Sequence, residues 1–138
     1  MLVMMAGLPG TGKSTLAHAV AERTGAVVLD KDQIRAALFP AELIEYSREQ
    51  DDFVLRVMLK VAGWTLRKNP RLWVVLDGRP FSKSYQLEMV INGTQWTKTA
   101  WRIVECACSE QRARSRLAQT DGHPAADRNF QLYQRLKT

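Results

Sequence analysis

The sequence predicts an α/β protein with a parallel β-sheet, as three observations indicate. Short, continuous apolar runs recur along the chain, and such runs are typical of strands that are buried on both faces. Segments with the apolar spacing of helices separate these runs, an alternation that favours a parallel sheet with helices on both faces. A glycine-rich stretch directly follows the first apolar run, at the sheet edge where open α/β folds bind their ligands.

Length and composition favour one globular domain over residues 1–138. The chain has 138 residues, of which 46% are hydrophobic, enough to bury a core without disulfides or metals. No apolar run approaches the ~20 residues that cross a bilayer, and the first run is too short for a signal peptide. We therefore expect a cytoplasmic protein, in which Cys106 and Cys108 are reduced thiols.

The positive charge is concentrated in the second half of the chain. The net charge is +6, and residues 71–138 contribute 11 basic and 6 acidic side chains, a net +5. Such an excess indicates either an anionic ligand, such as a nucleotide or nucleic acid, or a solvated basic helix face.

The predicted elements alternate along the chain. A helix over 13–24 should end at Gly25, Pro40 should end the second helix, and Asn69 with Pro70 should end the third. The third helical region has residues at the helical spacings of three and four, which predict one face: Phe53, Val57, Lys60, Val61 and Trp64. Ser109 should cap the fifth helix. The predicted strands are 2–6, 26–30, 72–77 and 99–108, and the predicted helical segments are 13–24, 31–39, 42–68, 82–90 (with Gly93 beyond its end), 110–119 and 127–137, with a loop at 120–124.

The glycine-rich stretch from Gly7 to Ser14 matches the phosphate-binding pattern G-x-x-x-x-G-K-[ST], with a strand before it and a helix after it. Its glycines let successive N–H groups turn inward around a phosphate, and the helix that follows directs its positive end at the same anion. Lys13 should reach the β- and γ-phosphates, and the Ser14 hydroxyl should bind Mg²⁺. The predicted nucleotide-binding residues are Gly7, Gly10, Thr11, Gly12, Lys13, Ser14 and Thr15, although Thr15 could equally be an ordinary first-turn residue.

Aspartates follow two of the other predicted strands. Asp77 has the position of the carboxylate that holds Mg²⁺ through water in proteins with this phosphate-binding loop. Asp32 lies two residues beyond a strand end and is either a general base or a helix N-cap, while Asp30 is either the cap or a turn residue. Arg35 lies on the same helix face as Asp32, where it holds an anionic acceptor, orients Asp32 or forms only a surface salt bridge.

Four segments resemble the small P-loop kinases of the AAA-33 and zeta-toxin-like group: residues 7–15, "VVLDKDQIRAALF", "VVLDGRPF" and "CSEQRARSRL". This group includes polynucleotide 5′-hydroxyl kinases, chloramphenicol phosphotransferases and gluconate kinases. The resemblance implies the three-layer P-loop NTPase fold and the use of ATP. It also implies that Asp32 is the general base and that Arg35 contacts the acceptor.

The same resemblance implies a lid at about residues 110–130, whose arginines clamp the transferred phosphoryl group. Arg112 and Arg116 lie one helical turn apart and share a face, and Arg128 is a further clamp candidate. Relatives of this group continue with a fifth strand and a final helix, whereas this chain stops at Thr138. We therefore expect a four-stranded sheet without that strand and helix, in a chain that is truncated, partly ordered or completed by dimerisation.

Together these patterns predict an ATP- and Mg²⁺-dependent kinase that phosphorylates a hydroxyl group of a small molecule or of a nucleic-acid end. Trp64, Tyr85 and Trp96 either line a small-molecule pocket or pack against the fold. The alternative is a non-catalytic ATP-binding module or a toxin-like nucleotide binder. A hydrolase that transfers the phosphoryl group to water is a third interpretation.

Overall fold

The computed structural model describes residues 1–95 and 98–118 of the chain. Within them a four-stranded sheet has the order β2-β3-β1-β4, and every neighbouring pair is parallel. The predicted α/β class with a parallel sheet is therefore confirmed. Because the strands are parallel, their carboxyl ends meet at one edge, where Asp30 lies in register with Asp77. The strands are β1 (Leu2–Ala6), β2 (Val27–Asp30), β3 (Val74–Asp77) and β4 (Trp101–Glu105).

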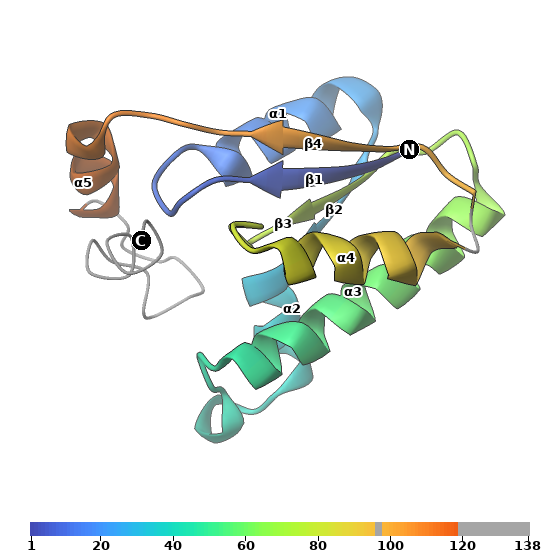
Figure 1. Ribbon diagram of the computed structural model, residues 1–138, viewed down its shortest axis with the longest axis horizontal. Helices are drawn as coiled ribbons and strands as arrows, with labels where there is room; N and C mark the ends of the chain where they lie inside the picture. The colour runs from blue at the N-terminus through green and yellow to red at the C-terminus, as the bar shows by residue number, and fades with distance from the viewer. Residues whose placement is uncertain (96–97, 119–138) are drawn as a thin grey trace.

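Helices cover both faces of this sheet (Figure 1). One core forms where α3 and α4 pack on the sheet, with Leu55, Met58 and Leu76 buried in it. A smaller core lies between the sheet and α1, around Ala17. The helices are α1 (Lys13–Thr24), α2 (Lys31–Leu38), α3 (Arg48–Lys68), α4 (Ser84–Thr94) and α5 (Glu110–Ala118), with a short 3₁₀ turn at Ala41–Leu43.

Two predicted helix boundaries are wrong by about a turn of helix or more, the start of the third helix and the end of the fourth. The third helix begins at Arg48, not at residue 42, because the Ser47 hydroxyl accepts a hydrogen bond from the Gln50 N–H at 3.2 Å and caps the helix there. Gly93 lies inside α4, not beyond it. A Cβ atom at Gly93 would come within 2.9 Å of the Leu59 side chain, so the glycine lets α4 pack closely against α3.

The predicted apolar face of α3 is also wrong. Phe53, Val61 and Trp64 are 48%, 41% and 57% exposed, and Trp64 is not among the described residues that line the two cavities beside the first loop. The helix carries two apolar stripes, and the one that includes Val54 and Leu55 provides more buried contacts with the sheet and with α4. Trp96 lies outside the described residues.

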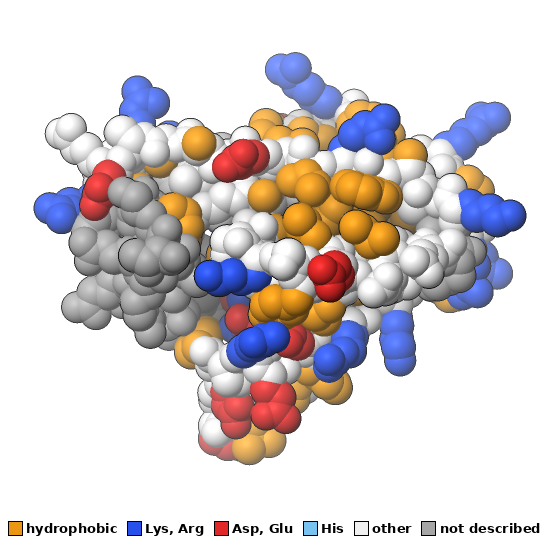
Figure 2. All heavy atoms as spheres, viewed as in Figure 1, with side chains coloured by type: hydrophobic (Ala, Val, Ile, Leu, Met, Phe, Trp, Pro, Cys, Tyr) orange, Lys and Arg blue, Asp and Glu red, His pale blue; other side chains and the backbone are white. Residues whose placement is uncertain are grey.

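Strand β4 forms one edge of the sheet and is largely exposed. Trp101 and Ile103 are about two-fifths exposed, and Figure 2 shows hydrophobic side chains gathered on the face that carries α4 and β4. Cys106 and Cys108 are both free thiols, as predicted. In the described part of the chain, every helix is too short or too polar to cross a membrane.

Candidate active site

The loop between β1 and α1 has the backbone that the glycine pattern predicts. Gly7, Gly10 and Gly12 all have positive φ angles, which other residues rarely adopt. The Lys13 ammonium donates hydrogen bonds to the carbonyl oxygens of Gly7 at 2.6 Å and Leu8 at 2.9 Å, which draws the loop around the end of α1. The loop is therefore already curled in the way that phosphate binding requires.

A cavity of about 680 Å³ lies beside this loop. Five of the seven predicted nucleotide-binding residues line it. The other two, Gly7 and Thr11, line a smaller cavity of about 350 Å³ that adjoins the same loop. The five that line the main cavity are Gly10, Gly12, Lys13, Ser14 and Thr15.

Asp77 ends β3 and is only 1% exposed. Neither of its carboxylate oxygens has a hydrogen-bond partner within the part of the chain that the structure describes. A buried carboxylate without donors is costly, so this side chain suits a bound cation. Mg²⁺ is commonly held by one or two protein oxygens, with water and phosphate oxygens as its other ligands. Ser14 and Asp77 therefore fit Mg²⁺, and residues 1–95 and 98–118 contain no larger cluster of metal-ligating side chains.

The two aspartates near the start of α2 have different roles. The Asp30 carboxylate accepts hydrogen bonds from the N–H groups of Asp32 at 2.8 Å and Gln33 at 3.0 Å, so Asp30 is the N-cap. The alternative that Asp32 caps the helix is wrong. Asp32 occupies the second helical position and lines the main cavity.

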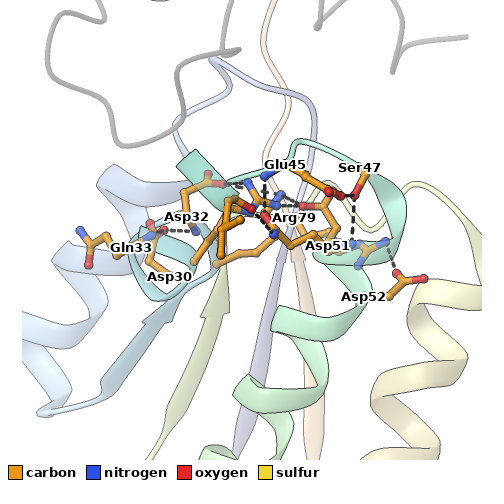
Figure 3. A network of polar contacts seen from close by, with 12 residues as sticks. Asp30, Asp32, Gln33, Glu45, Ser47, Asp51, Asp52 and Arg79 are labelled. Carbon is orange, nitrogen blue, oxygen red and sulfur yellow. Dashed lines mark hydrogen bonds and ion pairs between the residues drawn. The ribbon is translucent and has the colours of Figure 1, made fainter. Parts of the chain in front are cut away.

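Arg35 lies in a buried charge network, so the surface salt bridge considered for it is wrong. Its guanidinium is 3.2 Å from the Asp32 carboxylate and also pairs with Asp51, and it lies 5.1 Å from the ring of Tyr46. The Lys31 ammonium is 3.0 Å from the same Asp51 oxygen. Figure 3 shows Asp32 and Asp51 above the strand ends, where α2 and the start of α3 meet.

No site role was predicted for Arg48, Asp52 or Arg79, which lie next to this network, whereas Tyr85 was a predicted pocket candidate and does line the main cavity. Arg79, in the loop after β3, lies 2.7 Å from Asp52 of α3 and donates a hydrogen bond to the Tyr85 hydroxyl at 2.8 Å. The Arg48 guanidinium stacks over the Tyr85 ring at 4.0 Å. Arg79 lies two residues beyond a strand end, as Asp32 does, so the same positional rule applied to "LDGRPF" would have found it.

Helix α5 packs against the phosphate-binding loop. The Arg116 guanidinium donates a hydrogen bond to the Gly10 carbonyl at 3.2 Å, and Ala113 and Leu117 pack against Leu8. The Arg112 side chain is exposed. Arg128 and the rest of the predicted lid beyond residue 118 lie outside the described residues.

Cys106 lies close to Lys13 and Asp77, at the end of β4. Burial raises the pKa of its thiol, the charge of Lys13 partly opposes this, and Asp77 raises the pKa further. The thiol is therefore protonated at neutral pH, and a protonated thiol is a poor nucleophile.

A family model described as an AAA domain matches residues 2–135. No curated protein matches the sequence closely enough to count as a relative.

Solved kinases share the fold. A candidate kinase from Chloroflexus aurantiacus has a TM-score of 0.76 and 22% identity, covering 99% of this chain and 77% of its own. The APS kinase of Mycobacterium tuberculosis, solved with AMPPNP and APS, has a TM-score of 0.68 and 24% identity, over 86% and 68% of the two chains. A gluconokinase from Sinorhizobium meliloti has a TM-score of 0.62 and 18% identity, over 97% and 73%. The expected P-loop kinase fold is therefore confirmed.

Proposed function

This chain belongs to the AAA domain family whose model spans residues 2–135, and we propose that it is a kinase that transfers the γ-phosphoryl group of ATP to a hydroxyl group. One observation carries the proposal: Lys13 and Ser14 of the phosphate-binding loop and Asp32 of α2 all line a single cavity. A phosphate donor and a proton acceptor then face the same space. The kinase fold of the structural neighbours, one of them solved with AMPPNP, supports ATP as the donor.

The nucleotide end of the cavity uses the loop and its surroundings. The loop N–H groups and the Lys13 ammonium bind the β- and γ-phosphates, and Lys13 exchanges its two carbonyl partners for phosphate oxygens. Ser14 and, through water, Asp77 would hold Mg²⁺, which would neutralise charge on the phosphate oxygens.

The acceptor end of the cavity supplies the base. Asp32 takes the proton of the acceptor hydroxyl as that oxygen forms its bond to the γ-phosphorus. The bond between this phosphorus and the bridging oxygen breaks, and ADP leaves. Arg35 holds Asp32 in position through the contact at 3.2 Å. Arg112, Arg116 and Arg128 are proposed to neutralise the charge that develops on the transferred group.

The test is phosphoryl transfer from labelled ATP to a panel of hydroxyl compounds by the wild type and by Asp32→Asn. Asparagine preserves shape but cannot accept the proton, so we expect kcat to fall about 10²- to 10⁴-fold while ATP still binds. Glu49→Gln, an exposed carboxylate in the first turn of α3, is the matched control and should retain full activity.

Two results would contradict the proposal. Wild-type kcat in Asp32→Asn would remove Asp32 from the mechanism. A protein whose melting temperature rises with ATP, but whose ADP formation no acceptor accelerates, would be a non-catalytic ATP-binding module.

A further inference from the structure

The charges that line the main cavity do not balance. Among the described residues that line it, six are cationic and two are acidic. Lys31 and Arg35 contact the two acids, Asp32 and Asp51, and Lys13 serves the phosphate-binding loop. The remaining cations are Arg48, Arg79 and Lys83.

A single carboxylate, that of Asp52, is in contact with two of these three cations. It lies 2.7 Å from Arg79 and 3.7 Å from Arg48. The wall formed by Arg48, Arg79 and Lys83, which we call the outer wall, therefore keeps an excess of positive charge. Such an excess on the wall of a cavity attracts anions.

Arg79 is the buried centre of the outer wall. It is 3% exposed, and its Nη2 atom contacts Asp52 and the Tyr85 hydroxyl. Its Nε and Nη1 atoms, which carry three of the five N–H donors of a guanidinium, are buried without a hydrogen-bond partner in the described part of the chain. Unpaired buried donors are costly, so we infer that their acceptor arrives with a ligand.

Tyr85 holds the two arginines of the outer wall in place. Its ring centroid lies 4.0 Å from the Arg48 guanidinium carbon and 5.7 Å from that of Arg79, distances at which cations are attracted to an aromatic face. Guanidinium groups that are held in this way are well suited to bind the planar or tetrahedral oxygens of a carboxylate, phosphate or sulfate.

We propose that the acceptor alcohol carries an oxyanion group and that the outer wall of the cavity, centred on Arg79, binds this group while the hydroxyl faces Asp32. The proposal rests on the proposed kinase function for the identity of the ligand as an acceptor. The volume of about 680 Å³ that the acceptor shares with the donor phosphates is typical of small-molecule sites.

The experiment measures binding by calorimetry with Mg²⁺ and AMPPNP already bound, so that the phosphate-binding loop is filled. Three matched pairs of probes are compared: glycerate with glycerol, ribose 5-phosphate with ribose, and a 5′-hydroxyl dinucleotide with its uncharged methylphosphonate analogue. In at least one pair the charged member should bind at least about tenfold more tightly, the ratio that corresponds to about 1.4 kcal/mol. An advantage confined to the dinucleotide pair would identify a nucleic-acid end as the source of the oxyanion.

Three variants test whether the outer wall causes the tighter binding of the charged probes. Arg79→Gln and Arg48→Gln should each reduce it, and Arg71→Gln, an exposed arginine at the opposite end of β3, should leave it unchanged. Because Arg79→Gln breaks a buried ion pair and can unfold the protein, Arg48→Gln, whose side chain is 70% exposed, provides the second test.

The proposal is overturned if no charged member has an advantage, or if the advantage survives in both Arg79→Gln and Arg48→Gln. The preceding AMPPNP titration reports on the kinase proposal separately. If the protein does not bind AMPPNP, the kinase proposal is contradicted. The same three pairs of probes then test the anion site in the absence of nucleotide.

Discussion

Position 7 sets two requirements that only glycine, among the amino acids, meets together. Its φ angle of +133° is outside the range of ordinary side chains, and a Cβ atom there would lie 2.3 Å from the Cys106 carbonyl oxygen, which is backbone and cannot turn aside. Gly25, at the end of α1, also has a positive φ angle of 70°, but a Cβ atom there would have no neighbour within 4 Å. A comparison of substitutions at the two glycines therefore separates the effect of backbone strain, which both would suffer, from that of a steric clash, which only Gly7 would suffer.

Gly7→Ala should weaken ATP binding at least about tenfold, because β1 and β4 must separate or the loop must change shape to admit the methyl group. Gly25→Ala should cost about 1–2 kcal/mol of unfolding free energy and leave ATP binding unchanged. Urea denaturation and calorimetric titration with ATP measure the two effects. Wild-type affinity in Gly7→Ala would contradict the role of this glycine in the loop.

Asp32 lies at the cavity, inside the first turn of α2, because Asp30 and not Asp32 is the N-cap of this helix. Asp30 satisfies the first N–H groups, so Asp32 lies one residue beyond the start of the helix, free of that task. The sequence placed both aspartates at the strand end but could not assign the cap, because either side chain can accept such hydrogen bonds.

Asp30→Ala should lower the unfolding free energy by about 1 kcal/mol and lower kcat as well, because α2 frays at the turn that carries Asp32. Asp30→Asn keeps an acceptor oxygen and should restore both quantities. Urea denaturation and the kinase assay check this pair. Equal losses in both variants would show that the charge of Asp30 matters more than its cap.

Elements that are followed by a glycine were predicted well from the sequence. Both ends of β1 and α1 agree with the prediction, because Gly7 and Gly25 interrupt the apolar patterns next to them. The apolar face of α3 was wrong because apolar residues lie on two sides of this helix, and the packing against the sheet decides which side is buried. The contact of Arg35 with Asp51, 16 residues away, depends on how α2 and α3 meet. Periodicity within one helix carries no information about such a contact.

On the scale of the whole molecule, one helix connects the core to the charged network beside the main cavity. Helix α3 buries Leu55 and Met58 in the larger core, while its first turns carry Asp51 and Asp52 to Arg35 and Arg79. The packing of α3 in the core therefore also fixes the position of these two carboxylates.

Leu55→Ala should lower the unfolding free energy by about 2–5 kcal/mol, because the leucine is 1% exposed and its loss leaves a cavity. Leu43→Ala, at a leucine that is 58% exposed, should change the unfolding free energy by no more than about 0.5 kcal/mol. Urea denaturation measures both. A small loss in Leu55→Ala would mean that the neighbouring side chains can refill the space.

The hydrogen bond between Arg116 and Gly10 joins residues that are 106 positions apart in the chain. A ribosome that adds about 5–20 residues per second needs about 5 to 20 seconds to make the chain between them. The phosphate-binding loop is thus synthesised first but is completed only when α5 arrives. During translation, the Gly10 carbonyl therefore lacks this hydrogen-bond donor for that whole interval.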